Sequence, residues 1–425
     1  MSRTFVLILY NILLPVFFIV AFPAWLVKMW KRGGYGTGLL ERFAHFKALA
    51  ADEPQGVVYI HAVSVGEVLI ALKLIHLWLE KYPEEKIVLA ATTSTGHDVA
   101  LGKSPQGVRV IYSPIDFGFL VRAVFRRFSP SQIVLIEAEA WPNMLNVARR
   151  RKIPVSMVNV RLSKRSEARY QKFSSLVLPL FSMVDRYCVQ NEGDAERFVG
   201  LGVPREKIEV TGSIKFDPVG GAVPHRREEF QKMLDDFGVS RRVVMAASTH
   251  VGEEKLIAEA HLQSGTEALY VVVPRHAERR AEVVSDLQSA GFEVVLRSRY
   301  SAPQSPEKAC LVVDSTGELS DWTAHADLLV IGKSWLGEGG QNPAEAIVTG
   351  VPVLCGPHMG NFEPLISMLR EADGVKMLES AEFLPQAITD LLADSEAAKT
   401  MAENAQTVLS CHERAVEKTI DDLKS

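Results

Sequence analysis

The sequence is poor in cysteine and lacks the common nucleotide-binding fingerprints. Its four cysteines are spread over 425 residues with no CxxC pair or local Cys/His cluster, so we predict reduced core thiols and no structural zinc site. No GxGxxG follows the first strand of either predicted domain, and no GxxxxGKS or GxxxxGKT loop occurs. These absences argue against a dinucleotide-dependent enzyme and a P-loop NTPase. The formal net charge of −4 gives no indication of nucleic-acid binding.

Long apolar runs are also scarce, and the one that stands out is residues 4–27, which carry no charge. At about 1.5 Å per residue, a helix of this length crosses a hydrocarbon core of about 30 Å, despite two internal prolines. A basic flank follows at residues 28–32, and the positive-inside rule places it and the rest of the chain in the cytoplasm. A cleaved signal peptide is the alternative. In a signal peptide the positive charge precedes the apolar run and a cleavage site of small residues follows it, whereas here the basic flank follows the run and no such site closes it. We therefore predict a retained single-pass anchor over residues 1–32.

Behind this anchor, short apolar segments alternate with helical ones in two series, which predicts two parallel sheets with crossover helices. The first series gives a Rossmann-like domain over residues 33–217, with strands at 57–60, 86–91, 108–112, 132–137, 155–159 and 186–190. The second gives a Rossmann-like domain over residues 241–394, with strands at 243–247, 268–273, 292–296, 309–314, 327–331 and 352–355. We expect a linker at 218–240 and a single helix at 395–425 that packs across the domains. Two such domains are expected to face a central cleft, lined by their strand ends.

The stretch HAVSVGE joins the first predicted strand to its helix. Glu67 falls in the first helical turn, at a strand's carboxyl end, where a carboxylate can serve as a general base. The same spacing is also that of a capping box, in which Ser64 caps the helix and Glu67 bonds back to its amide. The residues alone leave both interpretations open.

In the second domain, polar turns follow the strands. The GEGGQN turn leads into a helix at Pro343, and the amides of Gly339 and Gly340 are suited to a phosphate. Glu345 is either an acceptor for ribose hydroxyls or an acid favoured by the helix dipole. Arg275, with His276 beside it, follows a strand and is suited to phosphate, the alternative being a helix cap. Two similar polar turns contain Lys215 and Ser248.

Acceptor-side candidates lie in the first domain. Glu137 and Glu139 alternate along a strand end, so at most one is expected to enter the cleft, and we favour Glu139. Basic residues crowd positions 149–169, among them Arg161. Such a tract is commonly a solvated face, but beside a membrane it also attracts a phosphorylated lipid. We assign Ser64, Glu139 and Arg161 to the acceptor side.

Eight segments occur in this order after the anchor: HAVSVGE, TTSTG, IEAEAWPNML, VNVRLSKRS, VTGSIKFD, ASTHVGEE, VVPRH and GGQNPAEAIVTGVPVLCGPHMGNF. Together they resemble the 3-deoxy-D-manno-octulosonic acid (Kdo) transferase family of lipopolysaccharide biosynthesis, over about residues 35–370. The resemblance implies a GT-B fold and an inverting glycosyltransferase that needs no metal or other cofactor. It further implies CMP-Kdo as donor, a phosphorylated lipid A precursor of lipid IVA type as acceptor, and the cytoplasmic face of the inner membrane.

The resemblance also assigns roles to single residues. The proposed base of the HxxSxGE motif falls on Glu67, and the groups that contact CMP fall on Arg275, Asn342 and Glu345. The chain departs from the family pattern at Gln341, where histidine is usual, and at Ala346, where proline is usual. The alternatives are a membrane-associated GT-B transferase that uses a UDP-sugar, and a sugar-nucleotide-binding protein without turnover.

Overall fold

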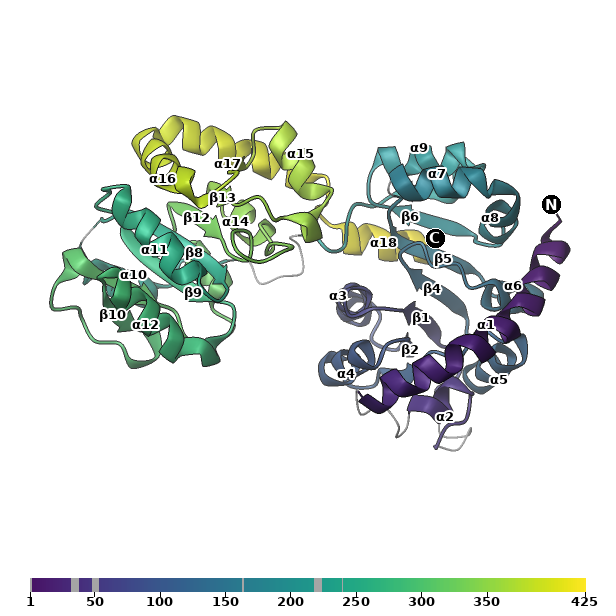
Figure 1. Cartoon of the computed structure of the whole chain (residues 1–425). Helices are drawn as coiled ribbons and strands as arrows, with labels where there is room; N and C mark the ends of the chain where they lie inside the picture. The colour runs from purple at the N-terminus through teal and green to yellow at the C-terminus, as the bar shows by residue number, and fades with distance from the viewer. Residues whose placement is uncertain (1, 32–37, 48–52, 163, 218–223, 239) are drawn as a thin grey trace. The chain divides into compact units, whose positions relative to one another are not determined.

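The computed structural model describes residues 2–31, 38–47, 53–162, 164–217, 224–238 and 240–425. The chain divides into two compact units (Figure 1). Unit 1 comprises Met1–Gly220 and His412–Ser425, and unit 2 comprises Gly221–Cys411. Each unit is built on one seven-stranded parallel sheet, as the two series of alternating segments predict.

The sheet of unit 1 has the order β3-β2-β1-β4-β5-β6-β7. Chain order reverses between β1 and β4, and this switch point is where open α/β sheets bind ligands. All five residues of β1 are buried, because helices cover both faces of a parallel sheet. The strands are β1 (Val58–Ala62), β2 (Ile87–Ala91), β3 (Arg109–Tyr112), β4 (Gln132–Ile136), β5 (Val155–Val160), β6 (Arg186–Val189) and β7 (Ile208–Val210).

Two apolar cores, one on each face of this sheet, fix the helices of unit 1. On one face, Val68 and Trp78 of α3 pack with Val416 and Ile420 of α18. On the other, residues of α5, α6, α8 and α9 pack together, including the fully buried Phe125. The helices are α3 (Val65–Lys81), α4 (Ser94–Lys103), α5 (Gly118–Phe128), α6 (Pro142–Arg151), α7 (Lys164–Lys172), α8 (Ser174–Phe181), α9 (Glu192–Gly200) and α18 (Ala415–Lys424).

The sheet of unit 2 has the order β10-β11-β9-β8-β12-β13-β14, with its switch point between β8 and β12. Its strands are β8 (Val243–Thr249), β9 (Leu269–Pro274), β10 (Glu293–Leu296), β11 (Ala309–Val312), β12 (Leu328–Ile331), β13 (Val353–Cys355) and β14 (Lys376–Met377). Its helices are α10 (Glu228–Asp235), α11 (Glu253–Gln263), α12 (Arg280–Ala290), α13 (Leu319–Thr323), α14 (Ala344–Val348), α15 (Leu365–Glu371), α16 (Leu384–Ala393) and α17 (Ser395–Ser410).

Several predicted boundaries need correction. The expected linker at 218–240 contains α10, because Phe230 is buried and stacks on Trp322 at 4.0 Å; its residues 218–223 and 239 lie outside the described residues. The expected single helix at 395–425 is two helices, because Arg414 adopts a φ of 57° between α17 and α18. The latter belongs to unit 1. Cys411, predicted in the core, is exposed.

The apolar run forms one continuous helix, α1 (Arg3–Lys31), whose stretch Arg3–Ala24 is long and apolar enough to cross a membrane. Along one side this helix, drawn in purple in Figure 1, packs against α6 and α8 of the same unit. The side-chain amides of Asn11 and Asn143 exchange two hydrogen bonds of 3.0 Å, and Phe18 meets the ring of Phe117 edge-on at 5.6 Å. The other side of α1 is exposed, at Ile12, Leu13, Val16, Phe17, Ile19 and Val20.

Candidate active site

The Ser64–Glu67 pair lies at the carboxyl end of β1, beside the switch point of the unit 1 sheet, where α3 begins. Ser64 Oγ accepts a hydrogen bond from the Glu67 amide at 3.3 Å, and the Glu67 carboxylate accepts from the Ser64 amide, also at 3.3 Å. The predicted capping box is therefore present. Glu67 Oε1 also accepts from Ser64 Oγ at 2.8 Å, and Oε2 from the Val63 amide at 2.7 Å. With only 7% of the residue exposed, this carboxylate is held in one orientation.

Two further carboxylates share this edge of the sheet. Desolvation by neighbouring protein groups, followed by the charge of Glu67, raises the pKa of both Glu137 and Glu139. The expectation that at most one of them enters the cleft stays a prediction. Strand alternation does not apply here, because β4 ends at Ile136 and Glu137 adopts a φ of 63°.

Two cations accompany these carboxylates. Arg161 follows β5, and Lys215 lies in the loop after β7. The positive charges of both residues oppose the rise in the pKa of Glu137. The sequence predicts that Lys215 binds the donor, and the structure places this residue in unit 1. Desolvation and the charge of Arg161 lower the pKa of the Lys215 ammonium group, whereas the charge of Glu137 opposes this change. Its role in binding the donor stays a prediction.

The loop that carries Lys215 is held by a hydrogen bond to Asn159, a residue at the end of β5 that the sequence analysis missed. Asn159 is 1% exposed, adopts a φ of 56°, and its Oδ1 accepts a hydrogen bond of 2.9 Å from the Ile214 amide. Lys73 of α3 donates to the Ile214 carbonyl at 3.2 Å. Asp217, at the end of the loop, accepts from the amides of Arg414 and Val416 and so holds the start of α18.

His61 of the HAVSVGE segment supports the site from within β1. Its ring is buried, Nδ1 lies 3.0 Å from Ser113 Oγ, and the ring centre lies 5.2 Å from that of Trp141. Burial lowers the pKa of His61 to about 4, so the imidazole is neutral at physiological pH. This histidine positions the strand end and carries no charge there.

In unit 2, a buried carboxylate that the sequence analysis missed organises the loops after β8 and β12. Glu253 is fully buried and accepts hydrogen bonds from four backbone amides: His250 at 3.0 Å, Lys333 at 2.5 Å, Trp335 at 3.1 Å and Leu336 at 3.3 Å. One side chain thus joins segments about 80 residues apart. Ser248, near the end of β8, adopts a φ of 55° at a shift in strand register.

The glycines of the GEGGQN turn are required by packing. Gly339 and Gly340 adopt φ values of 104° and 72°. A Cβ atom on Gly339 would lie 2.2 Å from the Asn361 amide nitrogen, and one on Gly340 would lie 2.3 Å from the sulfur of Met359. Beyond this turn α14 begins as predicted, with Pro343 at its N-cap and Asn342 Oδ1 accepting from the Ala344 amide at 3.1 Å.

Polar side chains predicted to bind the donor gather around this turn. Arg275, His276 and Glu345 are exposed, so their polar groups are accessible to a ligand. Desolvation by surrounding groups raises the pKa of Glu345, and the nearby charge of Arg275 opposes this rise. Gln341 Nε2 lies 3.1 Å from His250 Nε2, and the rings of His250 and His276 are 5.9 Å apart.

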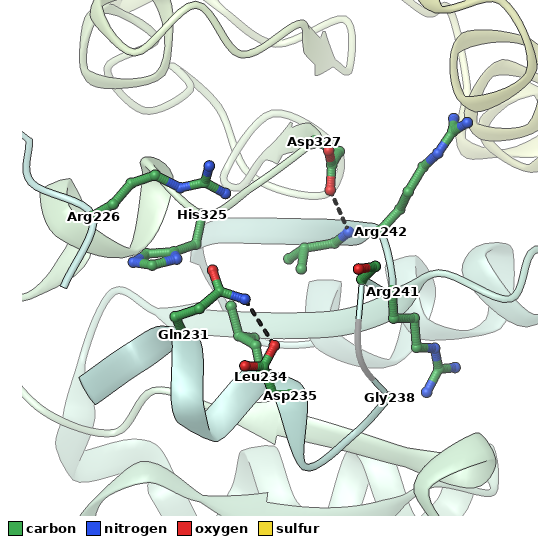
Figure 2. Close-up of a pocket in the computed structure, with 11 residues that line it drawn as sticks. Arg226, Gln231, Leu234, Asp235, Gly238, Arg241, Arg242, His325 and Asp327 are labelled. Carbon is green, nitrogen blue, oxygen red and sulfur yellow. Dashed lines mark hydrogen bonds between the residues drawn. The ribbon is translucent and has the colours of Figure 1, made fainter. Parts of the chain in front are cut away.

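A polar cavity of about 260 Å³ lies elsewhere in unit 2, at the amino ends of β8 and β12 (Figure 2). None of the predicted site residues lines it. Asp327 accepts from the Val243 amide at 2.8 Å, and Arg241 donates to the Pro306 carbonyl at 2.7 Å. The cavity therefore belongs to the packing of the sheet and not to the predicted donor site.

The described part of the chain contains no group of three or more His, Cys, Asp or Glu side chains that could hold a metal ion. Transfer without a metal stays a prediction.

Comparison with known proteins identifies the family. The model of the 3-deoxy-D-manno-octulosonic-acid transferase family matches residues 37–218. A 3-deoxy-D-manno-octulosonic acid transferase of Haemophilus influenzae is 31% identical over 398 residues, which cover 92% of this chain and 91% of the relative. The chain belongs to the Kdo transferase family. A Bordetella pertussis member is 30% identical over 414 residues, covering 93% of this chain and 94% of the relative.

Membership in the family makes this Kdo transferase a glycosyltransferase of lipopolysaccharide biosynthesis, as the sequence motifs predict. Among solved structures, S. aureus MnaA with UDP has a TM-score of 0.52 at 14% identity and covers 87% of this chain and 96% of its own. This likeness concerns the fold, and with the two parallel sheets it confirms the predicted GT-B class.

The structure therefore brings the predicted site residues together in two groups. Unit 1 holds Ser64, Glu67, Glu139, Arg161 and Lys215, whereas unit 2 holds Ser248, Arg275, His276, Gly339, Gly340, Asn342 and Glu345. Their individual roles stay predictions.

Proposed function

We propose that this Kdo transferase moves Kdo from CMP-Kdo to a phosphorylated lipid A precursor of lipid IVA type, with inversion at the anomeric carbon and Glu67 as the base. The observation that carries the proposal is the Glu67 carboxylate, fixed by Ser64 and the Val63 amide at the carboxyl end of β1, beside the switch point of the sheet. Ligands bind at this place in open α/β sheets, and the family name supplies the sugar.

The proposed reaction uses this fixed carboxylate. Glu67 takes the proton of the acceptor hydroxyl while the hydroxyl oxygen attacks the anomeric carbon of Kdo from the face opposite CMP. The bond from that carbon to the CMP phosphate breaks, CMP leaves with the electron pair, and the configuration inverts. Arg161 lies beside the carboxylates of the same edge and is suited to the phosphates of the acceptor.

The donor is proposed to bind the unit 2 group. The Arg275 guanidinium is exposed and suited to the CMP phosphate, and the backbone of the GEGGQN turn at Gly339 is proposed to bind the same phosphate. These groups stabilise the negative charge that grows on the leaving phosphate. Glu345 accepts from ribose hydroxyls. Gln341, which replaces the usual histidine, retains a donor and an acceptor.

The contacts of α1 support a membrane position. Asn11 pairs α1 with Asn143 of α6, and the other side of the helix, where Ile12, Val16 and Ile19 are exposed, is left for lipid. We therefore propose that α1 lies along the cytoplasmic surface of the inner membrane with this side in the apolar layer. The single-pass crossing predicted from the sequence is the alternative.

The direct test uses the purified full-length chain with CMP-Kdo and a tetra-acylated glucosamine disaccharide bisphosphate. We expect release of CMP that depends on the acceptor, and a product whose Kdo linkage has the inverted anomeric configuration by NMR. Release of UDP from a UDP-sugar in place of CMP, or no acceptor-dependent release from any donor, would contradict the proposal.

A further inference from the structure

A pocket of about 400 Å³ lies between α1 and the rest of unit 1 and has two chemically different ends. Its apolar wall is one side of α1, at Leu14, Phe17, Phe18, Ala21 and Phe22. The opposite wall comes from the polar ends of β2 and β3 and from the start of α6. A volume of this size lies at the lower end of the range for small-molecule sites, about 300–1,000 Å³.

The polar end of the pocket adjoins the strand that carries the proposed base. The amide of Thr92, which lines the pocket, donates to the Ala62 carbonyl at 3.0 Å. Ser113 and Trp141, also in the lining, contact the His61 ring. The next residue of this strand end, Val63, donates to Glu67. The polar end of the pocket is therefore packed against the strand end that leads into the Glu67 motif.

Two hydrogen-bonding atoms at this end are buried without a partner among the described residues: Thr92 Oγ1 and Trp141 Nε1. An indole N–H is only a donor, and a threonine hydroxyl is a donor as well as an acceptor, so the pair is suited to a carbonyl oxygen. The carboxylate at the same end, Asp116, already accepts from the amides of Asn143 and Met144 at 2.9 Å. The pocket thus offers these two donors, with the Arg42 guanidinium in the same lining, followed by an apolar channel.

We propose that this pocket holds one fatty acyl chain of the acceptor glycolipid, with its ester or amide carbonyl at Thr92 and Trp141 and its methylene groups along α1. The assignment rests on the proposed function, because it takes Glu67 as the place of transfer. Three observations support this occupant. The pocket has a polar end and an apolar end, as an acyl chain with its carbonyl group has, and it lies beside β1. The outer side of α1 is apolar and exposed, so a lipid chain can enter from there.

The first test blocks the pocket. In Ala21→Trp an indole fills the channel, while Ile19→Trp places the same side chain on the exposed side of α1 as the matched control. Each buried methylene contributes a factor of about four in affinity, so excluding two of them lowers kcat/KM for the tetra-acylated acceptor by about tenfold or more. Transfer to the deacylated disaccharide bisphosphate should stay unchanged in both variants. Equal loss on both acceptors, or no loss on the acylated one, would overturn the proposal.

The second test detects the chain without requiring transfer. An acceptor with brominated acyl chains, added to the full-length protein in unbrominated detergent micelles, should quench tryptophan fluorescence, and Trp141→Phe should remove most of that quenching. If Trp141-dependent quenching occurs but no CMP is released, the proposed function fails while the pocket assignment stands. If CMP is released without this quenching, or if a brominated phosphatidylethanolamine quenches Trp141 equally well, the assignment to the acceptor chain fails.

Discussion

Ser64 and Glu67 bind each other in two directions: Ser64 Oγ donates to Glu67 Oε1 at 2.8 Å and accepts from the Glu67 amide at 3.3 Å. One pair of side chains thus caps α3 and sets the direction of the carboxylate proposed as the base. The structural and the catalytic interpretations of the motif are compatible, because these hydrogen bonds use both lone pairs of Oε1 and one of Oε2, which leaves the second lone pair of Oε2 for a proton.

This relationship predicts the behaviour of Ser64→Ala. Loss of the cap should lower the free energy of unfolding by about 0.5–2 kcal/mol. It should also lower kcat, because Glu67 loses the hydroxyl that orients it, whereas Ser64→Thr keeps both the cap and most activity. Urea unfolding and CMP release measure the two effects. An unchanged kcat in Ser64→Ala would show that the hydroxyl does not position the base.

The glycine turn of unit 2 predicts a loss of donor binding on Gly339→Ala. The new Cβ would overlap the Asn361 amide, so the turn must move and CMP affinity should fall by about tenfold or more, measured by calorimetry. Gly317→Ala is the matched control, because Gly317 also has a positive φ but no atom within 4 Å of the position that a Cβ would occupy. Equal CMP affinity in both variants would remove the turn from the donor site.

Asp116 predicts a pH dependence of stability. Burial raises the pKa of its carboxyl from 3.8 to about 7. At pH values between these two, the carboxyl keeps its proton in the folded protein but has lost it in the unfolded chain. The free energy of unfolding should therefore fall as pH rises from about 4 to 7 and level off above. Asp116→Asn should flatten this slope, whereas Asp98→Asn, at an exposed position, should not. An unchanged slope in Asp116→Asn would contradict the assignment.

The proposed position of α1 predicts where residue 2 lies. With Cys411→Ser as background, Ser2→Cys in spheroplasts should resist a membrane-impermeant thiol reagent and react only after lysis, because α1 stays on the cytoplasmic side. Labelling of intact spheroplasts would show instead that the helix crosses the membrane.

Most of the fold could be predicted from the sequence because its signals are local. Buried parallel strands such as β1 are continuous apolar runs, and the capping box is defined by residues three positions apart. The short edge strands β7 and β14, of three and two residues, carry too little pattern to be recognised. The sequence predicts a linker in place of α10, because the stability of this helix depends on the contact of Phe230 with Trp322, 92 residues away.

The residues that the sequence analysis missed act through distant partners. Asn159 holds a loop 55 residues further on, and Glu253 binds amides about 80 residues away. Neither partner can be read from spacing along the chain. Local signals did exist, because Asn159 is a polar residue within a buried strand and Glu253 follows a polar turn. Such signals indicate that a polar residue has a structural role, but they do not show which residue it contacts.

The most direct test of the central claim compares Glu67→Gln with the wild type in acceptor-dependent CMP release, with the melting temperature recorded alongside. Glutamine can accept from the Val63 amide and donate to Ser64 Oγ, so the cap and the fold should persist, but it cannot take the proton. We predict that kcat falls by about a hundredfold or more while the melting temperature stays within a few degrees. Activity close to that of the wild type would show that Glu67 is only a helix cap and that another group, with Glu139 the next candidate, is the base.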